Sequence, residues 1–431
     1  MDVRAFVGLR MVMDACVRAG YSVEWAGKAS VHEYDVVLVS ITAACDWWSF
    51  LAERLHWRRG NYKIIVGGAG VLHIVPFVPF VDYFVLGRGE INTPKLLKLL
   101  DGKRGEIPGS IVEAKLFSYD KRYHIEQVSA PYDHAVTLEK GNKCFKEKTI
   151  GCNHKCYFCG YTWQRRFVSP YATYQMASDG LFGDIQHQEL AILDMMKDGN
   201  SIDFKKLRTT AIDGFSERLR FMVGKKIKKS VLTDFLILMV KSYAQPHNIK
   251  IYNICGYPTE TQEDWFEFKE CLINANNSQK TTSNGRQWRV QLHCTPFRSM
   301  PATPMACAPM SKQNYRGKIA QVLGPDLNGH IFMNERNIFA VQTLGTESLS
   351  TVMLDAIVHR GAMSDAENIR RLCLTPKFWR AKATVKEATL EKYFNMDHLF
   401  GEFDADTLPS RYLRTYAQVE RYWNRKFWEN A

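Results

Sequence analysis

Three cysteines within eight residues are the part of this sequence best suited to chemistry. Cys152, Cys156 and Cys159 are separated by three and then two residues. Thiolates are soft ligands that select zinc or iron–sulfur clusters. A structural zinc site usually takes four ligands, commonly as two separated pairs, and no fourth Cys or His stands at a standard offset from these three. The spacing therefore favours an iron–sulfur cluster in which one iron is left open to a substrate or cofactor.

The spacing of the three cysteines, with the aromatic Phe158 directly before the last one, resembles the signature of the radical S-adenosylmethionine (SAM) superfamily. The resemblance implies that the cysteines hold a 4Fe–4S cluster whose open iron binds SAM. It also implies that one electron, from a donor such as flavodoxin or ferredoxin, cleaves SAM to a 5′-deoxyadenosyl radical. From the cysteines alone, a redox-inert zinc knuckle or three buried thiols remain as alternatives.

Two later segments extend this resemblance. The segment that begins at Asp213 resembles the one that presents polar groups to the SAM ribose and carboxylate in the family. The segment from Gly256 to Thr261 resembles the family's Gly-x-Pro-x-Glu-Thr turn, near which adenosine packs. In physical terms, Pro258 fixes a turn, and Thr259 or Thr261 can cap a helix that begins at Gln262. The residues that the resemblance assigns to SAM are Asp213, Ser216, Arg218, Gly256, Pro258 and Glu260.

Residues 144–310 alternate apolar runs with helical patterns, which predicts a parallel sheet covered by helices. Two helices are clear, at Val231–Tyr243 and Gln262–Asn274. We expect six strand–helix units that form a partial, open (β/α)6 barrel, the radical SAM core, completed by residues 311–431. The cysteine loop should follow the first strand, because active-site residues in such barrels lie at the carboxyl ends of strands. The expected strands are Phe145–Ile150, Glu189–Leu193, Arg208–Ile212, Lys250–Cys255, Arg289–Cys294 and Ile331–Met333.

Residues 1–105 predict a separate Rossmann-like domain with a parallel sheet, and residues 106–143 a linker to the second domain. Helices are expected near Leu9–Val17, Trp47–Trp57 and Thr93–Leu100, and glycines follow the strands where a doubly wound sheet has its ligand crevice. The expected strands are Tyr21–Trp25, Asp35–Ile41, Lys63–Gly68 and Asp82–Gly87.

The first domain resembles the cobalamin-binding-type domain at the N-terminus of many radical SAM enzymes, through Val66–Gly70 and Val85–Glu90. The cobalamin-ligating pattern Asp-x-His-x-x-Gly does not occur, since His32 lacks both the Asp and the Gly. We therefore expect a degenerate domain that shapes or covers the active site and does not bind cobalamin. Cobalamin binding in a base-off mode, without a histidine ligand, is the alternative.

The net charge of the chain indicates a polyanionic partner. The chain has 431 residues, a formal charge of +12 and 11 cysteines. The charge favours nucleic acid or a nucleotide as partner, although a basic surface kept for solubility would give the same value. An odd number of cysteines and the absence of a signal pattern at the N-terminus favour a reducing cytoplasm. No apolar run is long enough to span a membrane.

The C-terminal region, residues 311–431, is expected to be mostly helical beyond the barrel. It ends in two runs that interleave cations with aromatics, Arg411–Tyr416 and Arg421–Trp428. Such a run can line a groove for a nucleic-acid strand. An amphipathic helix packed on the barrel explains the same pattern equally well.

The sequence therefore predicts a radical SAM enzyme that modifies a nucleic-acid base or nucleotide. In general build it is similar to phage-encoded radical SAM isomerases of thymine hypermodification, which move a glycyl group on thymidine from a nitrogen to a carbon linkage. Two other classes remain as alternatives. One is a radical SAM methyl- or methylthio-transferase that acts on RNA or a small molecule, and the other is a non-enzymatic metal-containing nucleic-acid-binding protein.

Overall fold

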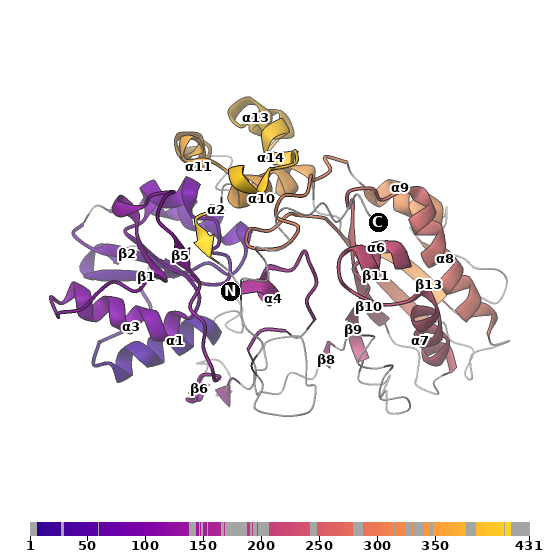
Figure 1. The fold of residues 1–431 in the computed structure, drawn as a ribbon, viewed down its shortest axis with the longest axis horizontal. Helices are drawn as coiled ribbons and strands as arrows, with labels where there is room; N and C mark the ends of the chain where they lie inside the picture. The colour runs from indigo at the N-terminus through magenta and orange to yellow at the C-terminus, as the bar shows by residue number, and fades with distance from the viewer. Residues whose placement is uncertain are drawn as a thin grey trace.

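A computed structural model of the chain describes 7–26, 30–58, 60–137, 144–145, 147, 150–152, 154–164, 168, 188–189, 192, 196, 207–241, 248–278, 288–313, 315–323, 330–331, 339–344, 348–375, 385–408 and 410–414. Over these residues the protein is a mixed α/β structure with two main sheets (Figure 1). Among the described helices none is both long and apolar enough to cross a bilayer.

The N-terminal sheet has four strands in the order β1-β2-β3-β4, of which the first three are parallel. Its strands are β1 (Val36–Ser40), β2 (Lys63–Gly67), β3 (Tyr83–Val85) and β4 (Ile111–Glu113). Strand β4 runs antiparallel to β3 and comes from the segment that the sequence predicted to be a linker. The predicted strand Tyr21–Trp25 is wrong, because these residues have no regular structure.

Helices cover both faces of this sheet, and alternation along the strands decides which residue faces which helix. Ile65 and Val85 face the side on which α1 (Val7–Arg18) and α3 (Gly89–Leu100) lie. Ile64, Val66 and Phe84 face the other side, toward α2 (Ala44–Arg54). The three helices predicted in this region are confirmed, and α3 begins four residues earlier than predicted.

The second sheet has six strands in the order β12-β13-β11-β10-β9-β8, all parallel except β12. Helices α7 (Lys229–Lys241), α8 (Gln262–Asn277) and α9 (Tyr315–Leu323) pack on one face of it (Figure 1). The sheet is open, and no closed barrel exists among the described residues. Its strands are β8 (Gln188–Glu189), β9 (Leu207–Ala211), β10 (Asn248–Cys255), β11 (Trp288–Pro296), β12 (His330–Ile331) and β13 (Phe339–Leu344).

Two strand predictions for this sheet are wrong. The predicted first strand, Phe145–Ile150, does not join it: β7 (Cys144–Phe145) pairs with β6 (Val136–Thr137), and Ile150 forms an isolated bridge with Val168. The predicted last strand corresponds to β12, which is antiparallel, and the parallel strand beside it is β13. Strand β13 carries Gln342 and Thr343, which break the apolar run by which a buried strand is recognised.

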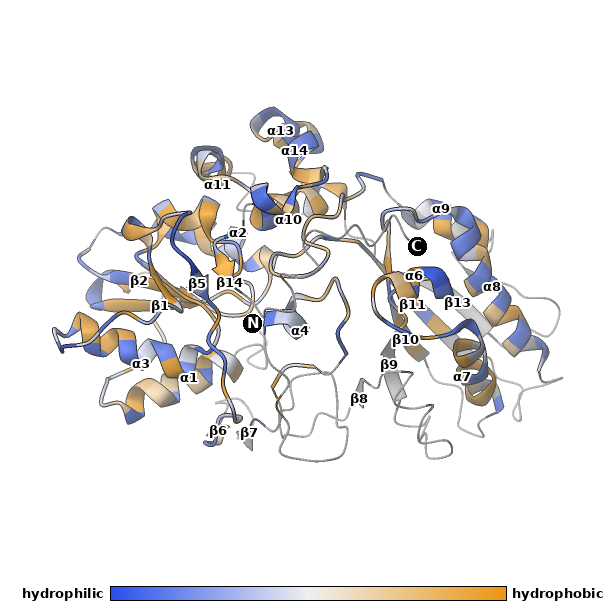
Figure 2. Ribbon diagram, in the orientation of Figure 1, coloured by the Kyte–Doolittle hydropathy of each residue, from blue (hydrophilic) through white to orange (hydrophobic). Residues whose placement is uncertain are grey.

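The C-terminal region is mostly helical where it is described, as predicted. It contains α10 (Leu349–Arg360), α11 (Ala366–Leu374), α13 (Glu387–Tyr393) and α14 (Met396–Phe400). These helices gather beside α2, and β14 (Leu413–Arg414) pairs with β5 (Tyr123–His124). Figure 2 shows the apolar residues concentrated along the strands and on the sides of the helices that meet them.

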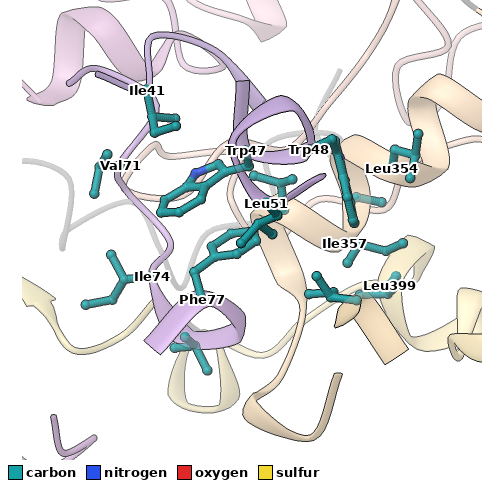
Figure 3. Packing of buried hydrophobic residues seen from close by; sticks show 14 of the residues in the cluster. Ile41, Trp47, Trp48, Leu51, Val71, Ile74, Phe77, Leu354, Ile357 and Leu399 are labelled. Carbon is teal, nitrogen blue, oxygen red and sulfur yellow. The ribbon is translucent and has the colours of Figure 1, made fainter. Parts of the chain in front are cut away.

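One apolar core joins the N-terminal sheet to these C-terminal helices. The rings of Trp47 and Phe77 stack with centroids 3.9 Å apart, and Leu51, Ile357 and Leu399 belong to the same cluster (Figure 3). This cluster extends from residue 31 to residue 413 and so crosses each boundary between the predicted domains. The predicted domain boundaries stay a prediction.

A buried histidine gives this junction a pH dependence. His73 is 1% exposed, and its Nε2 donates to the Gly361 carbonyl oxygen at 2.6 Å. Burial lowers the pKa of His73 from 6.5 to about 4. The folded pKa lies below the unfolded one, so the unfolded chain binds the proton more strongly and acid favours unfolding.

We expect the free energy of unfolding to fall by about 2 kcal/mol between pH 7 and pH 5 through His73 alone. The variant His73→Gln should lose this part of the pH dependence, while His398→Gln, at an exposed position, should keep it. Urea unfolding at several pH values measures the difference. An unchanged slope in His73→Gln would contradict the assignment.

Candidate functional site

The cysteine loop is held in place by the short helix that follows it, α4 (Gly160–Gln164). Trp163 Nε1 donates to the Cys156 carbonyl oxygen at 2.8 Å. The Thr162 hydroxyl lies 3.0 Å from the carbonyl oxygen of Cys152 and 2.7 Å from that of His154. The loop conformation is therefore fixed by α4, and its thiols need no bond to one another to hold it.

The three thiols are gathered but differ in exposure. Cys156 is 8% exposed, and Cys152 and Cys159 are partly exposed. The Cys156 thiol lies within electrostatic range of both other cysteines. Burial raises the pKa of Cys156 to about 12. Burial also raises the pKa of Cys159, and hydrogen bonds from the backbone N–H groups of Thr162 and Tyr161 lower it in part. A bare thiolate is therefore disfavoured here unless positive charge binds it.

The donor set is three thiols on one loop. Within the described part of the chain, no three His, Cys, Asp or Glu side chains converge closely enough to hold one metal ion. Ligands of a cubane cluster bind three different irons, so they need not converge on one point. Three thiols on one loop, in electrostatic contact with one another, are compatible with this requirement.

The cysteine loop docks on the turn after helix α6 (Glu217–Met222). Tyr157 donates its backbone N–H to the Val223 carbonyl oxygen at 2.8 Å. A Cβ at Gly224, whose φ is +77°, would lie 2.9 Å from the Lys155 carbonyl oxygen. On its other side the loop meets the segment after β11, where Met305 donates its backbone N–H to the Tyr157 carbonyl oxygen at 3.2 Å.

The segment at Asp213 comes to the same place. Asp213 has a φ of +50° and forms an ion pair with Lys225. Both side chains are within electrostatic range of the Cys156 and Cys159 thiols. Ser216, which the resemblance assigns to SAM, is buried, is the N-cap of α6 and donates to Asp264.

The turn from Gly256 to Thr261 is built as predicted and joined to the first segment. Thr261 is the N-cap of α8. Arg218 pairs with Asp264 at 2.6 Å and donates to the Thr259 carbonyl oxygen at 2.9 Å. Gly256 has a φ of +77°, and a Cβ there would lie 2.5 Å from the Tyr315 ring, so this position requires glycine.

Glu260 is committed to the turn itself. Its carboxylate accepts the backbone N–H groups of Gly256 and Tyr257 at 2.6 and 3.0 Å and the Trp265 indole N–H at 2.6 Å. Burial raises the pKa of Glu260 to about 7, although these three donors favour the ionised form. Pro258 lies in the same turn and is half-buried.

Comparisons with known proteins were made with this geometry in hand. No protein-family model matches the chain. No curated protein matches it significantly. The assignment of function therefore depends on the site itself.

Aromatic packing joins the two turns to the cysteine loop. The buried Tyr257 donates its hydroxyl to the Asp213 carbonyl oxygen at 3.1 Å. Its ring lies 5.1 Å from Phe297 and 6.4 Å from Phe158 of the cysteine loop. The structure thus brings together the three segments that the sequence analysis selected, from positions more than a hundred residues apart.

Sequence reasoning missed three polar residues of this site: Lys225, Asp264 and Tyr257. Asp264 had a signal, because an acidic residue three positions after an N-cap threonine closes a capping box. The sequence gives no signal for Lys225, because no local pattern indicates that the chain returns to Asp213. The two C-terminal runs that interleave cations with aromatics lie partly outside the described residues, which end at 414. Within them Tyr412 is buried in a turn and is hydrogen-bonded to Ile74 and Leu72 of the N-terminal region, so this ring is neither in a helix nor packed on the second sheet.

A cavity of about 460 Å³ lies at the carboxyl ends of the N-terminal strands. Its walls include Gly67, Gly68 and Gly87, as the glycine pattern predicted, and Tyr161 of α4. Arg88 lines it as part of a buried ion-pair network in which it pairs with Glu147 at 2.6 Å. This volume is at the lower end of the range for small-ligand pockets, and a cobalamin cofactor is far larger than such ligands.

Proposed function

We propose that this protein is a radical SAM enzyme in which Cys152, Cys156 and Cys159 hold a 4Fe–4S cluster. The observation that carries the proposal is the packing of the cysteine loop against two turns, at Asp213 and Gly256, that resemble SAM-binding segments. When bound, the cluster would supply the electron that cleaves SAM to a carbon-centred radical. The chain itself supplies binding, orientation and exclusion of water.

The residues of the two turns fall into two roles in this proposal. Asp213 and Gly256 have left-handed backbone conformations that shape the two turns next to the cysteine loop. Ser216, Arg218 and Glu260 act as positioning residues, because their polar atoms already bind Asp264, Thr259 and the Gly256 turn. Pro258 restricts the turn between them.

The order of the second sheet supports an incomplete barrel. Parallel strands β8, β9, β10, β11 and β13 follow one another in chain order, and α7, α8 and α9 pack on one face. When each parallel strand is joined to the next by the same strand–helix–strand connection in the same direction, the sheet curves toward a closed barrel, as in (β/α) barrels. The opposite face of such a sheet is then the interior, with the carboxyl ends of β9 and β10 beside the cysteines.

We propose a nucleic-acid base or nucleotide as substrate, with isomerisation of glycyl thymidine in DNA as the specific reaction. The formal charge of +12 supports a polyanionic substrate. The small cavity of the N-terminal sheet and the missing ligand histidine support a mechanism without cobalamin.

Anaerobic reconstitution with iron, sulfide, SAM and a reductant tests the proposal. We expect close to four irons per chain with equal sulfide, and formation of 5′-deoxyadenosine. Nucleosides from digested DNA and RNA are then compared by mass spectrometry before and after reaction. Zinc without sulfide would refute the enzyme, and a methylated product would replace the isomerase by a transferase.

A further inference from the structure

The six-stranded sheet has one face packed by helices and one face that exposes polar and aromatic side chains. On β10, Ile249, Ile251 and Cys255 are buried against α7, α8 and α9. The alternate residues Lys250 and Tyr252 point to the opposite face and are exposed, Tyr252 by 37%. Parallel sheets are normally covered on both faces, so exposed side chains on a central strand of this sheet require an explanation.

Strand register arranges the side chains of this face in rows. Tyr252 lies between Ala211 on β9 and His293 on β11, and its ring centroid is 5.1 Å from that of His293. Lys250 lies in the neighbouring row beside Gln291. This face therefore presents the adjacent rings of Tyr252 and His293, with the Lys250 side chain two residues earlier on the same face of β10.

His293 has an unused hydrogen-bonding atom. Its Nε2 is buried and has no hydrogen-bond partner among the described residues. Burial and the nearby Lys250 lower the pKa of His293, so the imidazole is neutral at pH 7. A neutral imidazole can donate or accept one hydrogen bond, according to its tautomer.

The face leads to the cysteine loop. Ile254 stands two residues beyond Tyr252, about 7 Å along the strand toward its carboxyl end. It packs against the apolar cluster that includes Tyr257, Phe297 and the cysteine-loop ring Phe158. A group held at Tyr252 is therefore within a short distance, along one face, of the site proposed for radical formation.

We propose that this face binds the nucleobase of the substrate, with the base stacked on Tyr252, its edge hydrogen-bonded to His293 and its phosphate near Lys250. The proposal rests on the proposed function and names its substrate-binding surface. Exposed aromatics on a sheet stack bases in this way, and stacking tolerates any base. The shared chemistry is a nucleotide unit, either free or within a strand.

Titration of the full chain with thymidine monophosphate and with a short single-stranded oligothymidylate tests this surface. The variant Tyr252→Leu should weaken binding by about 5- to 150-fold, and Tyr252→Phe, which keeps the ring, should bind like wild type. His293→Phe keeps the ring contact and removes Nε2, which should cost about 2- to 10-fold. Tighter binding of the oligonucleotide supports a strand, and equal binding supports a free nucleotide.

The control is Phe266→Leu, which removes a 44% exposed aromatic from α8, on the helix-covered side of the sheet. Equal losses in Phe266→Leu and Tyr252→Leu would overturn the proposal, as would wild-type affinity in Tyr252→Leu or no binding of either probe. SAM cleavage by the wild type without nucleotide is measured in parallel. Its absence contradicts the proposed function alone, because the titration needs no turnover.

Discussion

Cleavage of SAM should fall to background when Cys156 is replaced by alanine. Cys156 is the most buried of the three thiols and interacts electrostatically with both others, so its loss leaves a buried cluster edge without a ligand. Iron content should fall together with the formation of 5′-deoxyadenosine. Cys152→Ala and Cys159→Ala should behave alike, because in the proposed cluster each thiol would bind a different iron.

The matched control is Cys271→Ala. Cys271 is also buried and free, but it lies in α8 within the core of the second sheet. It should keep both iron and SAM cleavage, and so should Cys16→Ala in α1. Cleavage retained in Cys156→Ala, with circular dichroism unchanged, would refute the cluster assignment.

The largest loss of stability is expected for Arg360→Met. Arg360 is 1% exposed at the end of α10. Its guanidinium donates to the carbonyl oxygens of Leu399, Gly401, Ala306 and Ala308 at 2.6–3.1 Å. Burial lowers the pKa of Arg360 to about 9, which leaves it protonated at pH 7.

Methionine fills much of the same volume but leaves four carbonyl oxygens without these donors. We expect a loss of about 3–5 kcal/mol in the free energy of unfolding, as for other broken buried polar networks. Arg371→Met is the control, because Arg371 is 60% exposed and pairs with Glu367 on the surface of α11. If the two variants unfold at the same urea concentration, the network does not stabilise the fold.

The sequence was sufficient for elements whose signal is local. Helices α1, α2, α7 and α8 were predicted from apolar spacing and caps, and Thr261 indeed caps α8. The strands β9, β10 and β11 were predicted from short segments that contain apolar and β-branched residues and are followed by turn residues. Local signals were also enough to select the cysteine loop and the turns at Asp213 and Gly256, which the structure brings together.

The predictions that were wrong concern elements whose partners lie far away in the sequence. No local signal distinguishes the edge strand β4 from a linker, because its partner β3 lies 25 residues earlier in the chain. The segment before the cysteine loop reads as a strand, but its pairing with β6 and Val168 keeps it out of the second sheet. The sequence also does not indicate that Tyr412 accepts a hydrogen bond from Ile74, because 338 residues separate them.

The apolar core of Figure 3 can form only late in synthesis, because it combines N-terminal residues with residues of the C-terminal helices. The apolar side of the N-terminal sheet, with Trp47 and Phe77, is covered by helices that begin at Leu349. Nascent chains grow by about 5–20 residues per second, so these side chains wait roughly 15–60 s for their partners. During that interval the sheet presents an apolar surface of the kind that holdase chaperones bind. We therefore expect this core to close only after the helices that begin at Leu349 have been synthesised.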